Sequence, residues 1–175
     1  MTTTRTHRRA LSIAAALAAG SVALTGCGNT NADAAATDPG SPATVTSVDG
    51  QQISLPATGE PTAVFFFSVG CGGCVGGVRS LGEAATAADK AGTEASFLAV
   101  DMDPGESQET IEEFMEYVDA EHVPAAIDTG AALSQRFGVA ALSTLIVVDA
   151  DGNVTFRGTD PSTRTITAEL EKAGA

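Results

Sequence analysis

Two cysteines separated by two glycines, Cys71-Gly72-Gly73-Cys74, have the residue types and the spacing that fit redox chemistry. A two-residue gap allows both sulfur atoms to lie at the first turn of a helix, close enough to form a disulfide. If Cys71 lies at the helix N-terminus, free backbone N–H groups and the helix dipole favour its thiolate. A thiolate attacks disulfides, and a second thiol resolves the mixed disulfide. The pair therefore predicts thiol–disulfide exchange, with Cys71 as nucleophile and Cys74 as resolving thiol.

Two other interpretations of the pair stay open. A structural disulfide suits an oxidising compartment, although closing a two-residue loop gains little chain entropy. A metal site is the other interpretation, but a closed zinc site needs four ligands. His122 is the remaining soft-to-borderline ligand after the N-terminal segment, and no second Cys-x-x-Cys occurs. Redox chemistry is therefore favoured over both.

The cysteine pair must be positioned by the elements on either side of it. The continuous apolar run at 63–68 predicts a strand that is buried on both faces. Apolar residues on one face predict a helix over 74–88, and residues 95–100 predict a second apolar strand. The i, i+3, i+4, i+7 pattern of apolar residues in 107–120 predicts an amphipathic helix. This alternation favours an α/β fold with a mixed sheet.

Shorter elements complete the predicted domain. They are two hairpins, a short strand, a short helix and a last helix: 45–48 with 51–55, 145–148 with 154–157, 123–127, 131–137 and the segment from 160 onward. Asp160 is predicted to cap the last helix, with Pro161 at its first position.

The order of strand, Cys-x-x-Cys, helix and strand, followed by Gly138-Val139 and the run 144–152, resembles the thioredoxin fold. The insertion formed by Asp101-Met102-Asp103-Pro104, the acidic helix and 123–128 resembles the TlpA/ResA branch of that superfamily. The resemblance implies an α/β, thioredoxin-like fold over residues 44–175. It would have a central mixed β-sheet flanked by helices, an N-terminal β-hairpin and an inserted strand and helix.

The same resemblance implies an activity. TlpA/ResA proteins are membrane-tethered, extracytoplasmic thiol–disulfide oxidoreductases, and most act as reductants. The implied partners are exported protein thiols or disulfides and a membrane thiol electron carrier, and no cofactor is implied.

The sequence departs from the family pattern at the active site. Gly70 replaces the usual Trp before the first cysteine, and Ser143 replaces the cis-proline that precedes the strand facing the disulfide. A cis bond before a non-proline residue costs about 3–4 kcal/mol, so Ser143 is expected to follow a trans bond or to be strained. Gly70, Ser143 and Thr144 are expected at the substrate groove. Phe65 and Gly77 occupy positions where relatives carry acids that move protons, so protons must come from elsewhere.

Because the cis-proline is thought to keep metals off the cysteines, its replacement by Ser143 raises an alternative function. In this alternative the protein is a metal or metalloid binding lipoprotein that uses the same cysteine pair.

The N-terminus predicts export and anchoring. A basic segment followed by a short apolar run predicts a lipoprotein signal peptide over 1–26. Leu24-Thr25-Gly26-Cys27 resembles the bacterial lipobox, which implies that Cys27 is lipidated and becomes the first mature residue. Residues 27–43 are predicted to form a flexible tether. The expected location is the extracytoplasmic face of the cell membrane, through a lipid anchor.

Acidic residues dominate the predicted mature chain. Six Lys and Arg against 22 Asp and Glu follow Cys27, which gives a net charge of −16. This charge excludes nucleic acid as a natural partner. Glu106 and the acids of the helix at 107–120 are interpreted as a solvated face, and Asp101 and Asp103 as part of a loop at a strand end.

Overall fold

The computed structural model describes residues 42–175, and its centre is a five-stranded mixed sheet with the strand order β5-β4-β3-β6-β7. The first two strands pair with each other in a separate antiparallel sheet. The strands are β1 Ala43–Thr46, β2 Gln52–Leu55, β3 Thr62–Phe67, β4 Ser96–Asp101, β5 Ala125–Ile127, β6 Thr144–Val148 and β7 Val154–Thr159. The helices are α1 Cys74–Ala91, α2 Gln108–Tyr117, η1 Thr129–Ala131, α3 Ala132–Phe137 and α4 Thr163–Lys172.

The central strand β3 is buried along its whole length, as its apolar sequence predicts. It runs parallel to β4 and antiparallel to β6, which confirms the mixed sheet. In this register Phe67 lies beside Asp101 of β4, and Phe66 lies beside Thr144 of β6. The carboxyl ends of β3 and β4 therefore meet at one edge of the sheet, and the chain leaves this edge toward Cys71.

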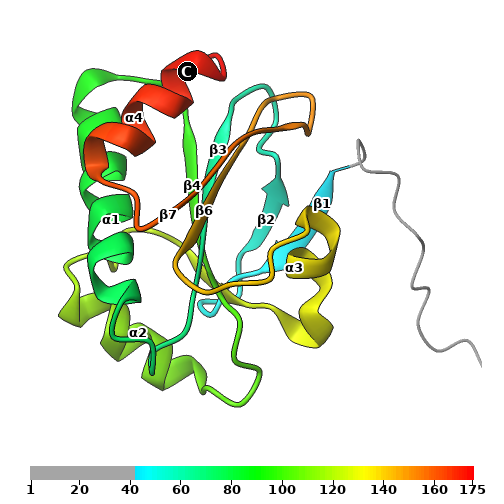
Figure 1. Ribbon diagram of the computed structural model, residues 1–175, viewed down its shortest axis with the longest axis vertical. Coiled ribbons are helices and arrows are strands. Elements are labelled where there is room, and N and C mark those ends of the chain that lie inside the picture. Colours follow the sequence, from blue (N-terminus) through cyan, green and yellow to red (C-terminus); the bar gives the residue numbers. More distant parts are fainter. Residues whose placement is uncertain (1–41) are drawn as a thin grey trace, which may run out of the picture. The chain divides into compact units, whose positions relative to one another are not determined.

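Two layers cover the faces of the sheet. Figure 1 shows α1, α2 and α4 on one side of the sheet, and α3 with the β1–β2 hairpin on the other side. Side chains alternate between the layers along β3, since Phe65 and Phe67 pack with α1 and α2. Val64 and Phe66 pack with β2 and α3 in the second cluster. This arrangement confirms the sheet flanked by helices, with the N-terminal hairpin and the inserted α2 and β5.

Local hydrogen bonds set the ends of several elements. The predicted first hairpin is present, but its first strand ends at Thr46, because Ser47 opens the turn through its N–H bond to Gln51 O (2.9 Å). The prediction that Asp160 caps the last helix is wrong. Ser162 is the N-cap of α4, and its side chain accepts a hydrogen bond from the N–H of Thr165 (3.2 Å). Asp160 instead has a left-handed backbone and bonds to the turn before β6.

Candidate active site

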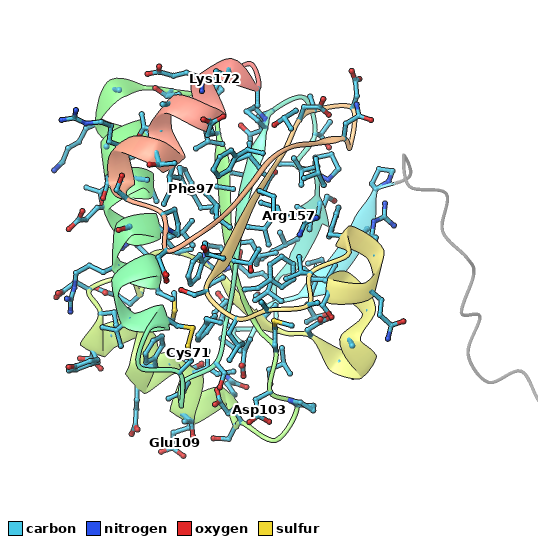
Figure 2. All side chains as sticks on the ribbon, in the orientation of Figure 1. Cys71, Phe97, Asp103, Glu109, Arg157 and Lys172 are labelled. Atoms are coloured by element: carbon cyan, nitrogen blue, oxygen red, sulfur yellow. A yellow bond between two sulfur atoms is a disulfide. The ribbon has the colours of Figure 1, made fainter. Side chains whose placement is uncertain are left out.

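Cys71 and Cys74 form a disulfide, with their Cα atoms 5.4 Å apart. Figure 2 shows this bond at the lower end of α1, beside the labelled Cys71. The two sulfurs differ in access, because Cys71 is half-buried whereas Cys74 is fully buried in the core cluster under α1. Of the two cysteines, Cys71 is therefore the one that is partly open to solvent.

The predicted start of the helix at Cys74 is confirmed, but this start leaves Cys71 outside the helix. The residue at the N-terminus of α1 is Cys74 and not Cys71, so the expected position of the nucleophile is wrong by one turn. Cys71 lies in the preceding turn, where its N–H bonds to Ser68 O (3.0 Å) and its carbonyl accepts from Cys74 N (2.9 Å). This turn continues directly into the helix, so Cys71 still lies ahead of the positive end of the helix dipole.

The start of α1 suits a negative charge on sulfur. Gly73 at the N-cap has no side chain to bond the first N–H groups, and residues 74–77 include no Asp or Glu. These N–H groups and the dipole favour a thiolate at the cysteine pair. Gly70, Gly72 and Gly73 are exposed, so a protein substrate can come close to Cys71.

The loop between β3 and Cys71 is fastened by Glu106. The carboxylate of Glu106 accepts hydrogen bonds from the Ser68 hydroxyl (3.0 Å) and from the Val69 N–H (3.1 and 3.0 Å to its two oxygens). Glu106 precedes α2 and is half-buried, so its interpretation as part of a solvated face is wrong. The sequence could not show this bond, because the partners are 37 and 38 residues apart.

A second carboxyl group lies nearby at the end of β4. Asp101 is fully buried, and its Oδ1 accepts a hydrogen bond from the N–H of Asp103 (3.0 Å). Its Oδ2 is buried and receives no N–H or O–H donor from residues 42–175, while the carboxyl of Glu106 lies within hydrogen-bond reach of the Asp101 side chain. Burial raises the pKa of Asp101 to about 7; the N–H of Asp103 opposes this rise, and the neighbouring carboxyl of Glu106 adds to it. Asp101 is the last residue of β4 and not part of the loop that follows it, so its placement in a loop is wrong, and its burial was not anticipated.

Phe65 and Gly77, which the family resemblance aligns with acids of relatives, lie against each other in the core. A Cβ atom added to Gly77 would lie 2.1 Å from Cζ of Phe65, so the glycine makes room for the ring. Phe67, two residues further along β3, stacks on Phe114 of α2 with ring centroids 5.3 Å apart. A glycine inside a helix has an intrinsic cost of about 1 kcal/mol relative to Ala, and at position 77 the close approach of the Phe65 ring requires it.

The turn before β6 holds the two other expected groove residues. The peptide bond before Ser143 is trans, since the cis bond of the described chain precedes Pro56. Ser143 has a left-handed φ of 59°, and its hydroxyl donates to Asp160 Oδ1 (2.6 Å). Its carbonyl also accepts from the N–H of Asp160 (3.1 Å). Thr144 pairs with Phe66, which places this turn at the edge from which the Cys71 loop departs. Cys27 lies outside the described residues.

Several solved structures share this fold. StoA from Bacillus subtilis matches with a TM-score of 0.63 and 16% identity, over 78% of this chain and 98% of that chain. The exposed lipoprotein thioredoxin Etrx1 from Streptococcus pneumoniae matches with a TM-score of 0.64 and 19% identity, over 75% and 99%. DsbF from MTB matches with a TM-score of 0.63 and 22% identity, over 74% and 93%. These matches confirm the thioredoxin-like fold.

Sequence comparison adds a closer relative and a family. The chain is 56% identical over 151 residues to a protein of Streptomyces lividans described as "Mercury resistance operon ORF3", covering 86% of this chain and 77% of the relative. The family model for Redoxin matches residues 35–174. Because this match spans most of the chain, the protein belongs to the Redoxin family and is a thioredoxin-like redox protein with a Cys71–Cys74 disulfide.

Proposed function

We propose that this protein is a membrane-anchored, extracytoplasmic thiol–disulfide oxidoreductase that acts mainly as a reductant of exported proteins. The observation that carries the proposal is the unequal access of the two bonded cysteines. A half-buried Cys71 can meet a protein disulfide, and a buried Cys74 can attack only the mixed disulfide that follows. This is the division of labour that disulfide exchange requires.

The exchange proceeds in two balanced steps. The Cys71 thiolate attacks one sulfur of the substrate disulfide, forms a mixed disulfide, and releases the other substrate sulfur as a thiolate. Cys74 then loses its proton and attacks Cys71, which closes the Cys71–Cys74 bond and releases the second substrate thiolate. Two electrons have moved from the protein to the substrate, and a membrane thiol carrier returns them by the reverse exchange.

The substrate groove is proposed to include Gly70, Ser143 and Thr144. Support comes from the register of the sheet, because Thr144 pairs with Phe66 just before β3 ends. Ser143 is held rigidly by two bonds to Asp160, so its backbone can present a fixed edge to an extended substrate segment. The exposed Leu142 beside it supplies an apolar contact.

The location is proposed from the N-terminal motif. Cys27 would carry the lipid, and residues 27–43 would let the domain work close to the membrane. Etrx1, which shares the fold, is described as an exposed lipoprotein, and this supports the proposed location. In the described part, 42–175, no helix has the length and apolar character needed to cross a membrane. The mature charge of −16 argues for basic partner surfaces and against nucleic acid.

The proposal is tested by insulin reduction with a dithiol donor, using the chain and its Cys71→Ser and Cys74→Ser variants. The unaltered chain should reduce insulin, Cys71→Ser should be inactive, and Cys74→Ser should accumulate a mixed disulfide through Cys71. A reduction potential near or below about −200 mV would agree with a reductant, and one near about −120 mV would indicate an oxidant. Inactivity of the unaltered chain would contradict the function, and a mixed disulfide trapped through Cys74 would reverse the two roles.

A second candidate function is the binding of a soft metal ion by the reduced pair. The 56% identical relative is described by a mercury resistance operon, which favours this candidate. Thiolates are the protein ligands that soft cations prefer. Across residues 42–175 no cluster of three His, Cys, Asp or Glu side chains could hold a metal ion, so the ion would rely on the two sulfurs.

Metal binding is tested by adding Hg²⁺ to the reduced chain carrying Cys27→Ser and recording its mass. One mercury atom bound per chain, retained against a monothiol and lost in the Cys71→Ser and Cys74→Ser variants, is the expected result. Equal retention by a variant lacking both cysteines would contradict it.

A further inference from the structure

The buried carboxyl of Asp101 lies on the same face of the sheet as the buried thiol Cys74. Ala99 of β4 packs in the core cluster that contains Phe67 and Cys74. Asp101 follows two residues later on the same strand, so its side chain points to the same face. Phe67 and Asp101 are direct neighbours in the parallel pair, so this carboxyl lies at the edge where the chain departs toward the cysteines.

Glu106 links the neighbourhood of Asp101 to the loop that carries Cys71. Glu106 lies close enough to Asp101 to act on its protonation, and it is half-buried, so it reaches water. The same Glu106 carboxylate binds the Ser68 hydroxyl, and Ser68 O accepts the N–H of Cys71 (3.0 Å). Figure 2 places the labelled Asp103 and Cys71 at the same lower end of the molecule.

The surroundings of Asp101 let it hold or release a proton near neutral pH. Among the described residues, the charged groups that act on it are Glu106 and Asp103, both in the loop after β4. Its neighbours on the flanking strands, Phe67 of β3 and Ile127 of β5, are apolar. A buried carboxylate oxygen that receives no N–H or O–H donor is costly, so such a group calls for an explanation.

We propose that Asp101 accepts the proton of Cys74 in the resolving step, and that Glu106 passes this proton on to solvent. The inference rests on the proposed exchange function. As the S–H bond of Cys74 breaks, an O–H bond forms at Oδ2 of Asp101. The freed sulfur electron pair forms the bond to Cys71, and the bond between Cys71 and the substrate sulfur breaks, with its electron pair leaving on the substrate. During recharging the proton returns to Cys74.

In this role Asp101 supplies the proton transfer for which Phe65 and Gly77 have no suitable side chain. Phe65 and Gly77 fill the positions of the acids found in relatives, and they are in contact with each other and not with water. Asp101 reaches the same layer from the neighbouring strand. Its pKa of about 7 lets it act both as acceptor and as donor at physiological pH.

The test measures the attack of Cys71 and the later attack of Cys74 on the mixed disulfide as two separate phases. The reduced full chain carrying Cys27→Ser, which leaves two thiols, is rapidly mixed with one equivalent of 5,5′-dithiobis(2-nitrobenzoic acid). Attack by Cys71 releases the first coloured thiolate, and attack by Cys74 releases the second. Asp101→Asn should leave the first phase unchanged and slow the second on the order of 10²-fold at pH 7.

The pH profile distinguishes proton transfer from a structural effect. In the unaltered chain the second phase should rise through an inflection near pH 7, and Asp101→Asn should remove this inflection. Glu106→Gln should move the inflection to lower pH, because Glu106 raises the pKa of Asp101. The matched control Glu109→Gln removes an exposed carboxylate of α2 that is not among the groups acting on Asp101, and it should keep the profile.

Each other outcome overturns a defined part of the proposal. If the unaltered chain releases no coloured thiolate, the exchange function itself fails. If both phases occur but Asp101→Asn keeps the second phase and its inflection, or slows both phases equally at every pH, the role of Asp101 is wrong. If Asp101→Asn does not fold, an inflection that stays in place in Glu106→Gln overturns the inference.

Discussion

Two buried regions on the same face of the sheet differ in whether they hold an ionisable side chain. Midway along β3, Phe65 packs against Gly77 so closely that a Cβ atom would lie 2.1 Å from the ring. At the end of the neighbouring strand, Asp101 keeps a carboxyl group in the same layer. The first contact is apolar and sealed, whereas the second is polar and lies next to a half-buried Glu106. The difference is that only the second region holds an ionisable group, and a loop carrying Glu106 lies between that group and solvent.

The two contacts also differ in what they contribute to stability. A buried phenylalanine stabilises the fold through burial and dispersion, and the missing Cβ of Gly77 is what permits its position. A buried carboxyl without a full set of hydrogen bonds opposes folding, most strongly when it is charged. The first region therefore contributes packing, and the second holds a group that opposes folding at the edge of the sheet from which the chain leaves toward Cys71.

The largest effect on stability is expected from adding a Cβ atom to Gly77, where it would meet the ring of Phe65. Gly77→Ala should lower the free energy of unfolding by about 3 kcal/mol, because the new Cβ overlaps the ring of Phe65 and neither strand nor helix can move freely. Urea unfolding measures this loss. The matched control is Gly76→Ala on the exposed side of the same helix, which should stabilise by up to about 1 kcal/mol through helix propensity.

A double-mutant cycle sharpens this first prediction. Phe65→Leu shortens the ring side chain, so Gly77→Ala should be much less harmful in its presence than alone. Additive losses would show that the Phe65 ring and a Cβ atom at position 77 do not compete for the same space. The description of this region as tightly packed would then be wrong.

A smaller effect on stability is expected from replacing the Asp101 carboxyl by a neutral amide. The folded chain keeps the Asp101 proton up to about pH 7, whereas the unfolded chain loses it near the ordinary pKa of 3.8. The folded state therefore binds more protons between these values, and Asp101 makes stability fall as the pH rises through this window. Relative to the unaltered chain, Asp101→Asn should gain on the order of 1–2 kcal/mol between pH 4 and pH 8, allowing for solvent screening.

This gain is measured by urea unfolding of both oxidised proteins at each pH. A difference that is the same at pH 4 and pH 8 would mean that Asp101 titrates alike in the folded and unfolded chains. The polar region would then not perturb its acid, and the contrast with the sealed contact would be wrong.

The smallest effect is expected from releasing the loop ahead of Cys71. Glu106→Ala removes the acceptor for Ser68 and Val69, and should destabilise by about 1 kcal/mol, since the lost bonds are partly exposed. Faster hydrogen exchange of the Val69 amide should accompany it. The exposed Glu113 of α2 is the charge-matched control. If Glu113→Ala speeds exchange of the Val69 amide equally, Glu106 has no specific role in holding this loop.

Much of the fold follows from patterns over short stretches of sequence. The apolar run of β3, the amphipathic period of α2 and the turn residues of the hairpins each predict an element, and the order of elements indicates the thioredoxin-like fold. The ends are less predictable, as Asp160 and Ser162 show: both are good caps by type. The bonds between Ser143 and Asp160 withdraw Asp160 from the helix, and this contact spans 17 residues.

The chemistry of the site divides in the same way. The spacing of Cys71 and Cys74 by itself determined that they can form a disulfide, because three residues of chain fix how far apart the sulfurs can be. Which sulfur is buried, which carboxyl fastens the Cys71 loop and where Asp101 meets the core were decided only by the tertiary structure. These properties arise when β3 and β4 align and Glu106 reaches back across 37 residues, and neighbouring residues in sequence carry no record of that pairing.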